Sequence, residues 1–112
     1  MSIDALWQID FAAGAGGDLD AGAGVLILDG GRVRGGDSAF YYVGDYKVEN
    51  NVLEITVRLR RHAPGFESAV GRDDATLELR GRVDDSSISV TGKVVEEPAF
   101  IFVALLTRLE EL

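Results

Sequence analysis

Apolar and polar residues alternate one by one along three segments in the second half of the chain. Within residues 52–61, apolar side chains occupy the odd positions from 53 to 59, and polar or charged side chains occupy the even positions between them. Residues 75–83 and 88–95 show a similar alternation. A period of two is typical of β-strands with one buried face. We expect these segments to share one core, formed by Leu53, Ile55, Val57, Leu77, Leu79, Ile88 and Val90.

Short β-type runs separated by turn residues cover most of the rest of the chain. Clusters of Gly, Asp and Asn at 29–31, 49–51 and 84–87 indicate tight turns, because these residues accept the backbone angles that such turns require. Residues 12–24, rich in Gly, Ala and Asp, are interpreted as a flexible hairpin loop, and residues 63–74 as a long loop. The predicted strands are residues 5–11, 25–28, 32–34, 38–48, 52–61, 75–83, 88–95 and 99–109.

Eight sequential strands joined mostly by short connections predict an all-β fold, an antiparallel meander closed into a barrel. Closure is favoured because it removes the exposed edges of the sheet. The last hairpin but one can be tested for register: with a two-residue loop at 85–86, Leu79 faces Gly92 and Glu78 faces Lys93. An apolar side chain then meets a glycine and opposite charges meet each other, as cross-strand pairs prefer.

Length, charge and composition narrow the possible functions. The 112 residues suit a single domain, residues 1–112, and the excess of 19 acidic over 11 basic residues gives a net charge of −8. Nucleic acids require a positive surface, so we expect no direct nucleic-acid partner. There is no cysteine and only one histidine, His62, so we expect no metal or other cofactor. Residues 1–10 lack signal-peptide features and the longest apolar run, 99–106, is too short to cross a bilayer, so we expect a cytoplasmic protein.

No combination of side chains predicts an active site, and we expect a protein that is not an enzyme. The acidic pairs 73–74 and 84–85 lie in predicted exposed segments, where aspartate is common, whereas catalytic carboxylates usually need burial. Residues 18–20 lack the further ligands of a calcium loop. Three of the four residues before His62 are arginines, a cluster that would form an anion-binding patch or, more commonly, a solvated face.

Aromatic residues on the predicted strands have two possible roles. An eight-stranded barrel has an interior just wide enough to be filled by side chains or to hold one small ligand. In a chain this short we favour filling over a cavity. The residues concerned are Trp7, Phe11, Phe40, Tyr42 and Tyr46, together with Phe100 and Phe102.

Two apolar runs do not alternate, which predicts a second buried surface on the outside of the barrel. In residues 25–28 and 100–106 both faces of the strand are apolar, although a barrel buries only one of them. A homodimer contact would cover the other face; the alternative is a cover by the 63–74 loop or the glycine-rich loop. On the last strand, either Phe100, Phe102, Ala104 and Leu106 or Ile101, Val103 and Leu105 must point outward. The candidate interface residues are Val25, Ile27, Phe100, Ile101, Phe102, Val103 and Leu105.

The segment 24–46 carries a moderately specific motif. It contains an apolar strand, a glycine-rich turn, the step Gly35-Gly36-Asp37-Ser38, a run of aromatics, and Gly44 closely followed by Tyr46. These features resemble the GrlR family, small negative regulators of type III secretion gene expression, and the similarity extends weakly over most of the chain. The resemblance implies an eight-stranded, lipocalin-like barrel that forms a homodimer and sequesters a transcriptional activator rather than binding DNA.

The resemblance also points to a partner-binding hairpin. The family's best-described member presents an exposed acidic run before its fifth strand, and the matching residues here are 48–51, with one acid. The candidate partner-binding residues are therefore Glu49, Asn50 and Asn51. Two functional hypotheses follow: a non-enzymatic regulator that binds a protein partner, and a binder of a small apolar molecule or lipid inside the barrel. The volume left inside the barrel distinguishes them.

Overall fold

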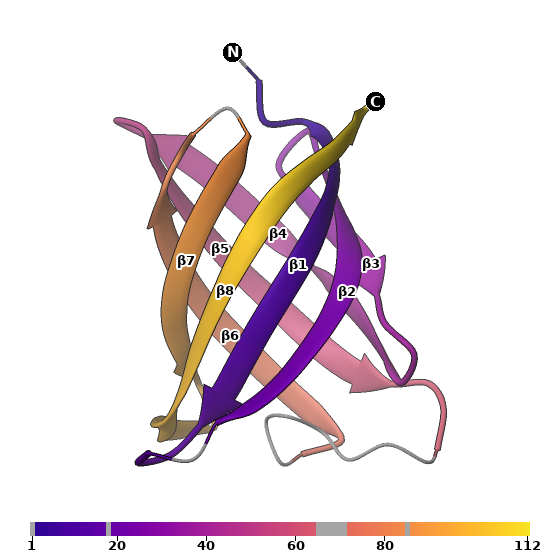
Figure 1. Cartoon of the computed structure of the whole chain (residues 1–112), viewed down its shortest axis with the longest axis vertical. Helices are drawn as coiled ribbons and strands as arrows, with labels where there is room; N and C mark the ends of the chain where they lie inside the picture. The colour runs from indigo at the N-terminus through magenta and orange to yellow at the C-terminus, as the bar shows by residue number, and fades with distance from the viewer. Residues whose placement is uncertain (1, 18, 65–71, 85) are drawn as a thin grey trace.

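Eight β-strands form one closed antiparallel barrel in the computed structural model of the chain (Figure 1), which describes residues 2–17, 19–64, 72–84 and 86–112. Each strand pairs with the next one along the chain, and the last strand pairs with the first. The predicted all-β meander barrel of lipocalin-like type is therefore confirmed. The strands are β1 Ala5–Gly14, β2 Asp20–Asp29, β3 Arg32–Gly36, β4 Phe40–Glu49, β5 Val52–Arg61, β6 Asp74–Arg82, β7 Ser87–Val94 and β8 Glu97–Glu111.

The alternating segments adopt the predicted register. Leu79 pairs with Gly92 and Glu78 pairs with Lys93 across β6 and β7, as the hairpin analysis predicted. All seven residues assigned to a shared core are buried. The predicted loop at 63–74 lies largely outside the described residues, which lack 65–71, and the predicted turn at 84–87 is described except for residue 85.

The glycine-rich stretch is the main error in the predicted strands. Residues 12–24 were predicted as a flexible loop, yet β1 continues to Gly14 and β2 already begins at Asp20. The inward positions of this part of β2 are glycines because large side chains lie against them: a Cβ on Gly22 would lie 2.5 Å from Cζ of Phe11. Glycine here makes room for an aromatic ring inside the barrel, and strand pairing with β1 holds the backbone extended.

Both chain termini lie at one end of the barrel (Figure 1), and fully buried side chains fill this end, among them Trp7, Leu28 and Leu53. Trp7 is fully buried there, its indole Nε1 donates a hydrogen bond to the Ile3 carbonyl at 2.9 Å, and the Arg108 guanidinium stacks 4.9 Å from the ring centroid. Tyr46 donates to the Asp4 carboxylate; desolvation, reinforced by this hydrogen bond, raises the pKa of Tyr46 to about 12. The opposite end carries the connections β1–β2, β3–β4, β5–β6 and β7–β8.

A candidate ligand cavity inside the barrel

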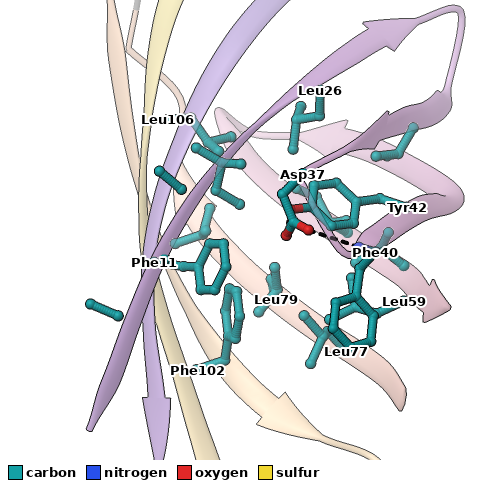
Figure 2. Close-up of a pocket in the computed structure, with 18 of the residues that line it drawn as sticks. Phe11, Leu26, Asp37, Phe40, Tyr42, Leu59, Leu77, Leu79, Phe102 and Leu106 are labelled. Atoms are coloured by element: carbon teal, nitrogen blue, oxygen red, sulfur yellow. Dashed lines mark hydrogen bonds between the residues drawn. The ribbon is translucent and has the colours of Figure 1, made fainter. Parts of the chain in front are cut away.

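The barrel interior is hollow towards the end that lies opposite the termini. A cavity of about 330 Å³ occupies it and is partly open to the outside. The prediction that side chains fill the interior is therefore wrong for this half of the barrel. Figure 2 shows the wall, in which side chains from many strands converge. Its apolar part includes Ile9, Phe11, Leu26, Val33, Phe40, Ile55, Val57, Leu59, Leu77, Leu79, Val90, Phe102 and Leu106.

Five of the seven aromatic residues considered from the sequence divide between the two ends. Phe11, Phe40 and Tyr42 line the cavity. Trp7 belongs to the filled end, as does Tyr46, which packs against the core from a partly buried position. The aromatic pattern therefore identified part of the cavity wall but could not separate it from the packed core.

A second aromatic ring completes the wall beside Phe11. Phe102 stacks on Phe11 with ring centroids 5.4 Å apart and an angle of 20° between the rings. Phe102 was a candidate both for the barrel interior and for the dimer interface. It points inward and is buried, so the interface alternative is wrong for this residue. Its neighbours across the sheet, Ala13 and Gly92, are small, so the ring has room inside the barrel. Phe100, another predicted interface residue, is partly buried against the core.

Short strand β3 shapes the opening of the cavity. It pairs with β2 only from Val25 to Asp29, so residues 20–24 of β2 have no neighbouring strand on that side among the described strands. Ala21 and Ala23, which alternate with the inward glycines, join the cavity lining at this free edge. The cavity is therefore bordered by an exposed strand edge as well as by side chains.

One polar pair, Asp37 and Tyr42, interrupts the apolar wall (Figure 2). Asp37 follows β3, and its Oδ1 accepts hydrogen bonds from the backbone N–H groups of Ala39 at 2.9 Å and Phe40 at 2.8 Å. Its Oδ2 accepts a hydrogen bond from the Tyr42 hydroxyl. Aspartate commonly closes turns in this way. Here the same carboxylate also lies on the wall of a cavity.

Tyr42 remains protonated at physiological pH. Burial, reinforced by the hydrogen bond to Asp37 and by its negative charge, raises the pKa of Tyr42 well above its usual range. Gly24 allows this arrangement, because a Cβ at that position would lie 2.6 Å from the Tyr42 hydroxyl oxygen. Asp37 was not among the site residues predicted from the sequence. The signal available was an aspartate beside two glycines at a strand end.

Two of the three arginines near His62, Arg60 and Arg61, form ion pairs at the rim. Arg61 binds Asp73 at 2.7 Å and lies 4.8 Å from the centroid of the Phe40 ring, and Arg60 lies 3.9 Å from Asp74. The acidic pair 73–74 is thus a partner of arginines, at exposed positions. The Nε2 of His62 lies 3.0 Å from the Asp37 carbonyl oxygen; since a carbonyl only accepts, this contact requires a hydrogen on Nε2.

The predicted partner-binding residues lie away from the cavity. Glu49, Asn50 and Asn51 are exposed at the β4–β5 turn, at the end of the barrel that carries the termini (Figure 1). Asn50 and Asn51 have φ values of 52° and 61°, the left-handed conformation that a tight hairpin turn requires. This geometry accounts for the two asparagines without a partner.

We also searched the chain for metal-binding clusters, membrane-spanning helices and similarity to known proteins. Among the described residues no group of three or more His, Cys, Asp or Glu side chains is placed to hold a metal ion. No helix in the described part of the chain is long and apolar enough to cross a membrane. No family model matches this chain, and no curated protein shows significant similarity to it.

Proposed function

We propose that this protein binds a small, mainly apolar molecule inside the barrel. The observation that carries the proposal is the partly open cavity of about 330 Å³, walled mainly by aliphatic and aromatic side chains, with the Asp37–Tyr42 pair and the exposed Asp20 and Ser38 as its polar side chains. Ligand pockets typically measure about 300–1,000 Å³ and combine apolar walls with a few placed polar groups. The cavity lies at the lower end of that range, which suits a small ligand.

The neutral fluorescent probe N-phenyl-1-naphthylamine is expected to bind the protein with an increase in fluorescence. Filling the cavity by Val57→Phe should weaken this binding at least about tenfold, or about 1.4 kcal/mol. The side chain of Val57 lines the cavity, whereas that of its neighbour Thr56 points outward and is exposed. Thr56→Phe is therefore the matched control and should leave the affinity unchanged. A fluorescence titration measures both.

Leu79→Phe, also on the cavity wall, provides a second inner variant in case Val57→Phe does not fold, and circular dichroism checks each fold. The proposal is wrong if the wild-type protein does not bind the probe, or if inner and outer phenylalanines weaken binding equally.

A second candidate function is regulation through protein contacts as a homodimer, as the resemblance to the GrlR family implies. The observation in favour is an apolar strip on the outside of β2 and β8, on either side of β1. Val25, Ile27, Ile101 and Leu105 are 45%, 38%, 53% and 42% exposed, and Val103 is partly exposed. Gln8 and Asp10 of β1 lie between the apolar residues of β2 and those of β8. Exposed apolar surface on a protein often marks an interaction site.

Analytical ultracentrifugation at micromolar concentration is expected to give twice the 12.0 kDa mass of the chain. The double substitution Ile101→Asp and Leu105→Asp should give the monomer, because it places two charges on the outer apolar strip. Thr56→Asp, exposed on the outer face of β5 and away from β2 and β8, should remain dimeric. A wild-type monomer would refute the dimer, and a dimer that survives the double substitution would refute its placement on β8.

A further inference from the structure

The cavity wall carries negative charge without a positive partner inside it. Two carboxylates, Asp20 and Asp37, belong to the lining, and no lysine, arginine or histidine is among the described residues that line it. Two basic residues contact the lining from the rim: Arg61 stacks on Phe40 but is bound to Asp73 and to the Ala63 carbonyl, and the Nε2 of His62 is directed to the Asp37 carbonyl oxygen. An anion inside the cavity would face like charge with no counter-ion.

The hydrogen-bonding groups of the polar pair lead to the same conclusion. Oδ1 of Asp37 already accepts two backbone N–H groups, and the single hydrogen of Tyr42 is given to Oδ2. A carboxylate has about four lone-pair positions and a hydroxyl has two. The positions that remain for a ligand are therefore lone pairs on Oδ2 and on the Tyr42 oxygen, and both are acceptors.

The other polar groups of the lining do not reverse the preference for a ligand that donates hydrogen bonds. Ser38 is a hydroxyl that both donates and accepts, and it is exposed. The free edge of β2 at residues 20–24 offers backbone N–H and C=O groups alike, since every second residue of a strand directs both of its backbone groups toward the same edge. The discriminating groups are the carboxylates and the oxygen of Tyr42.

We infer that the ligand is an apolar molecule whose polar end donates a hydrogen bond, a primary amine or a hydroxyl, and that carboxylate ligands such as fatty acids are excluded. This inference rests on the proposed binding function. The donor group of the ligand would contact Asp37 Oδ2 or the Tyr42 oxygen, while the apolar part of the ligand packs against Phe11, Phe102 and Leu79 on the cavity wall. A protonated amine would form a charge-assisted bond, about twice as strong as a neutral one.

Three decyl compounds that differ only in the polar group test this inference. Decylamine, decan-1-ol and sodium decanoate compete with N-phenyl-1-naphthylamine for the protein at neutral pH, the two ionic compounds below their critical micelle concentrations and the alcohol below its solubility limit. We expect decylamine to bind most tightly, decan-1-ol next, and decanoate at least about tenfold more weakly than decan-1-ol. Both ions are compared with decan-1-ol, because the net charge of −8 repels decanoate and attracts protonated decylamine but does not act on the uncharged alcohol.

Matched variants separate the local carboxylate from the overall charge. Asp37→Asn keeps an oxygen for the backbone N–H groups and should narrow the difference between alcohol and decanoate at least about threefold. Asp45→Asn removes the same charge from the exposed outer side of β4 and should change the difference in affinity between decan-1-ol and decanoate little. Should Asp37→Asn not fold, Tyr42→Phe removes an acceptor oxygen and should weaken decan-1-ol more than decanoate.

The outcomes distinguish this inference from the proposed function. Decanoate binding as tightly as decan-1-ol, or equal effects of Asp37→Asn and Asp45→Asn, would overturn the ligand class while leaving the binding cavity in place. Probe binding with no displacement by any decyl compound would also overturn it. Failure of the probe itself to bind would overturn the proposed function.

Discussion

Trp7→Ala is expected to lower the free energy of unfolding by about 3–5 kcal/mol, the usual cost of removing a buried tryptophan. Trp7 is fully buried at the filled end, and its indole is held by the Ile3 carbonyl on one edge and the Arg108 guanidinium over its face. The substitution removes all of these contacts and leaves a void. Because domains are stable by only about 5–15 kcal/mol, this loss is a large part of the total.

Urea denaturation followed by far-ultraviolet circular dichroism measures the effect, since Trp7 is the only tryptophan and its fluorescence is lost in the variant. Gln8→Ala, at the next residue and on the outer side of β1, should change stability by no more than about 0.5 kcal/mol. A loss below about 1 kcal/mol for Trp7→Ala would contradict the packed end described above.

Gly92→Ala is expected to destabilise the barrel by about 3 kcal/mol, the upper part of the range for overfilled sites. A Cβ on Gly92 would lie 1.8 Å from the Glu78 carbonyl oxygen and 2.9 Å from the Leu79 Cα, atoms of the paired strand β6. These are backbone atoms, so no side-chain rotation relieves the contact. The two strands must separate, and Phe102, which pairs with Gly92 on the other side, must shift with them.

The same chemical change at an open position provides the control. A Cβ on Gly17 would meet no atom within 4 Å, and its φ is outside the left-handed region. Gly17→Ala should therefore be neutral or stabilise the protein by up to about 1 kcal/mol. Similar melting temperatures for the two variants would contradict the close approach of β6 and β7.

The strand order and much of the core could be predicted from alternation alone. In β5 every second side chain is apolar, so a shift of one residue would expose the whole set, and the inward face of Leu53, Ile55 and Val57 follows. The segment from Phe100 to Leu106 carries no such information, since either face satisfies the pattern. Small neighbours on both adjacent strands leave room for Phe102 inside the barrel. To predict its inward direction from the sequence, the register across three strands would have to be known.

The cavity and its polar pair could not be predicted from the sequence in the same way. Whether an eight-stranded barrel is filled depends on the summed volumes of inward side chains from all strands and on where each lies along the barrel. Gly22 and Gly24 look like loop residues in the sequence, yet each faces an aromatic ring or its hydroxyl. Asp37 could be expected to close a turn. The sequence does not reveal that its carboxylate lies on the cavity wall and binds Tyr42.

The most direct measurement is a methyl ¹³C–¹H NMR titration of the protein with N-phenyl-1-naphthylamine. Binding inside the barrel should shift the methyl resonances of Val57, Leu77, Leu79 and Val90, which line the cavity, and leave those of Val25, Ile27, Ile101 and Leu105 on the outer strip nearly unchanged. Leu53, buried outside the cavity lining, serves as an internal reference for a change of the whole fold. Shifts confined to the outer strip would contradict a binding site within the barrel.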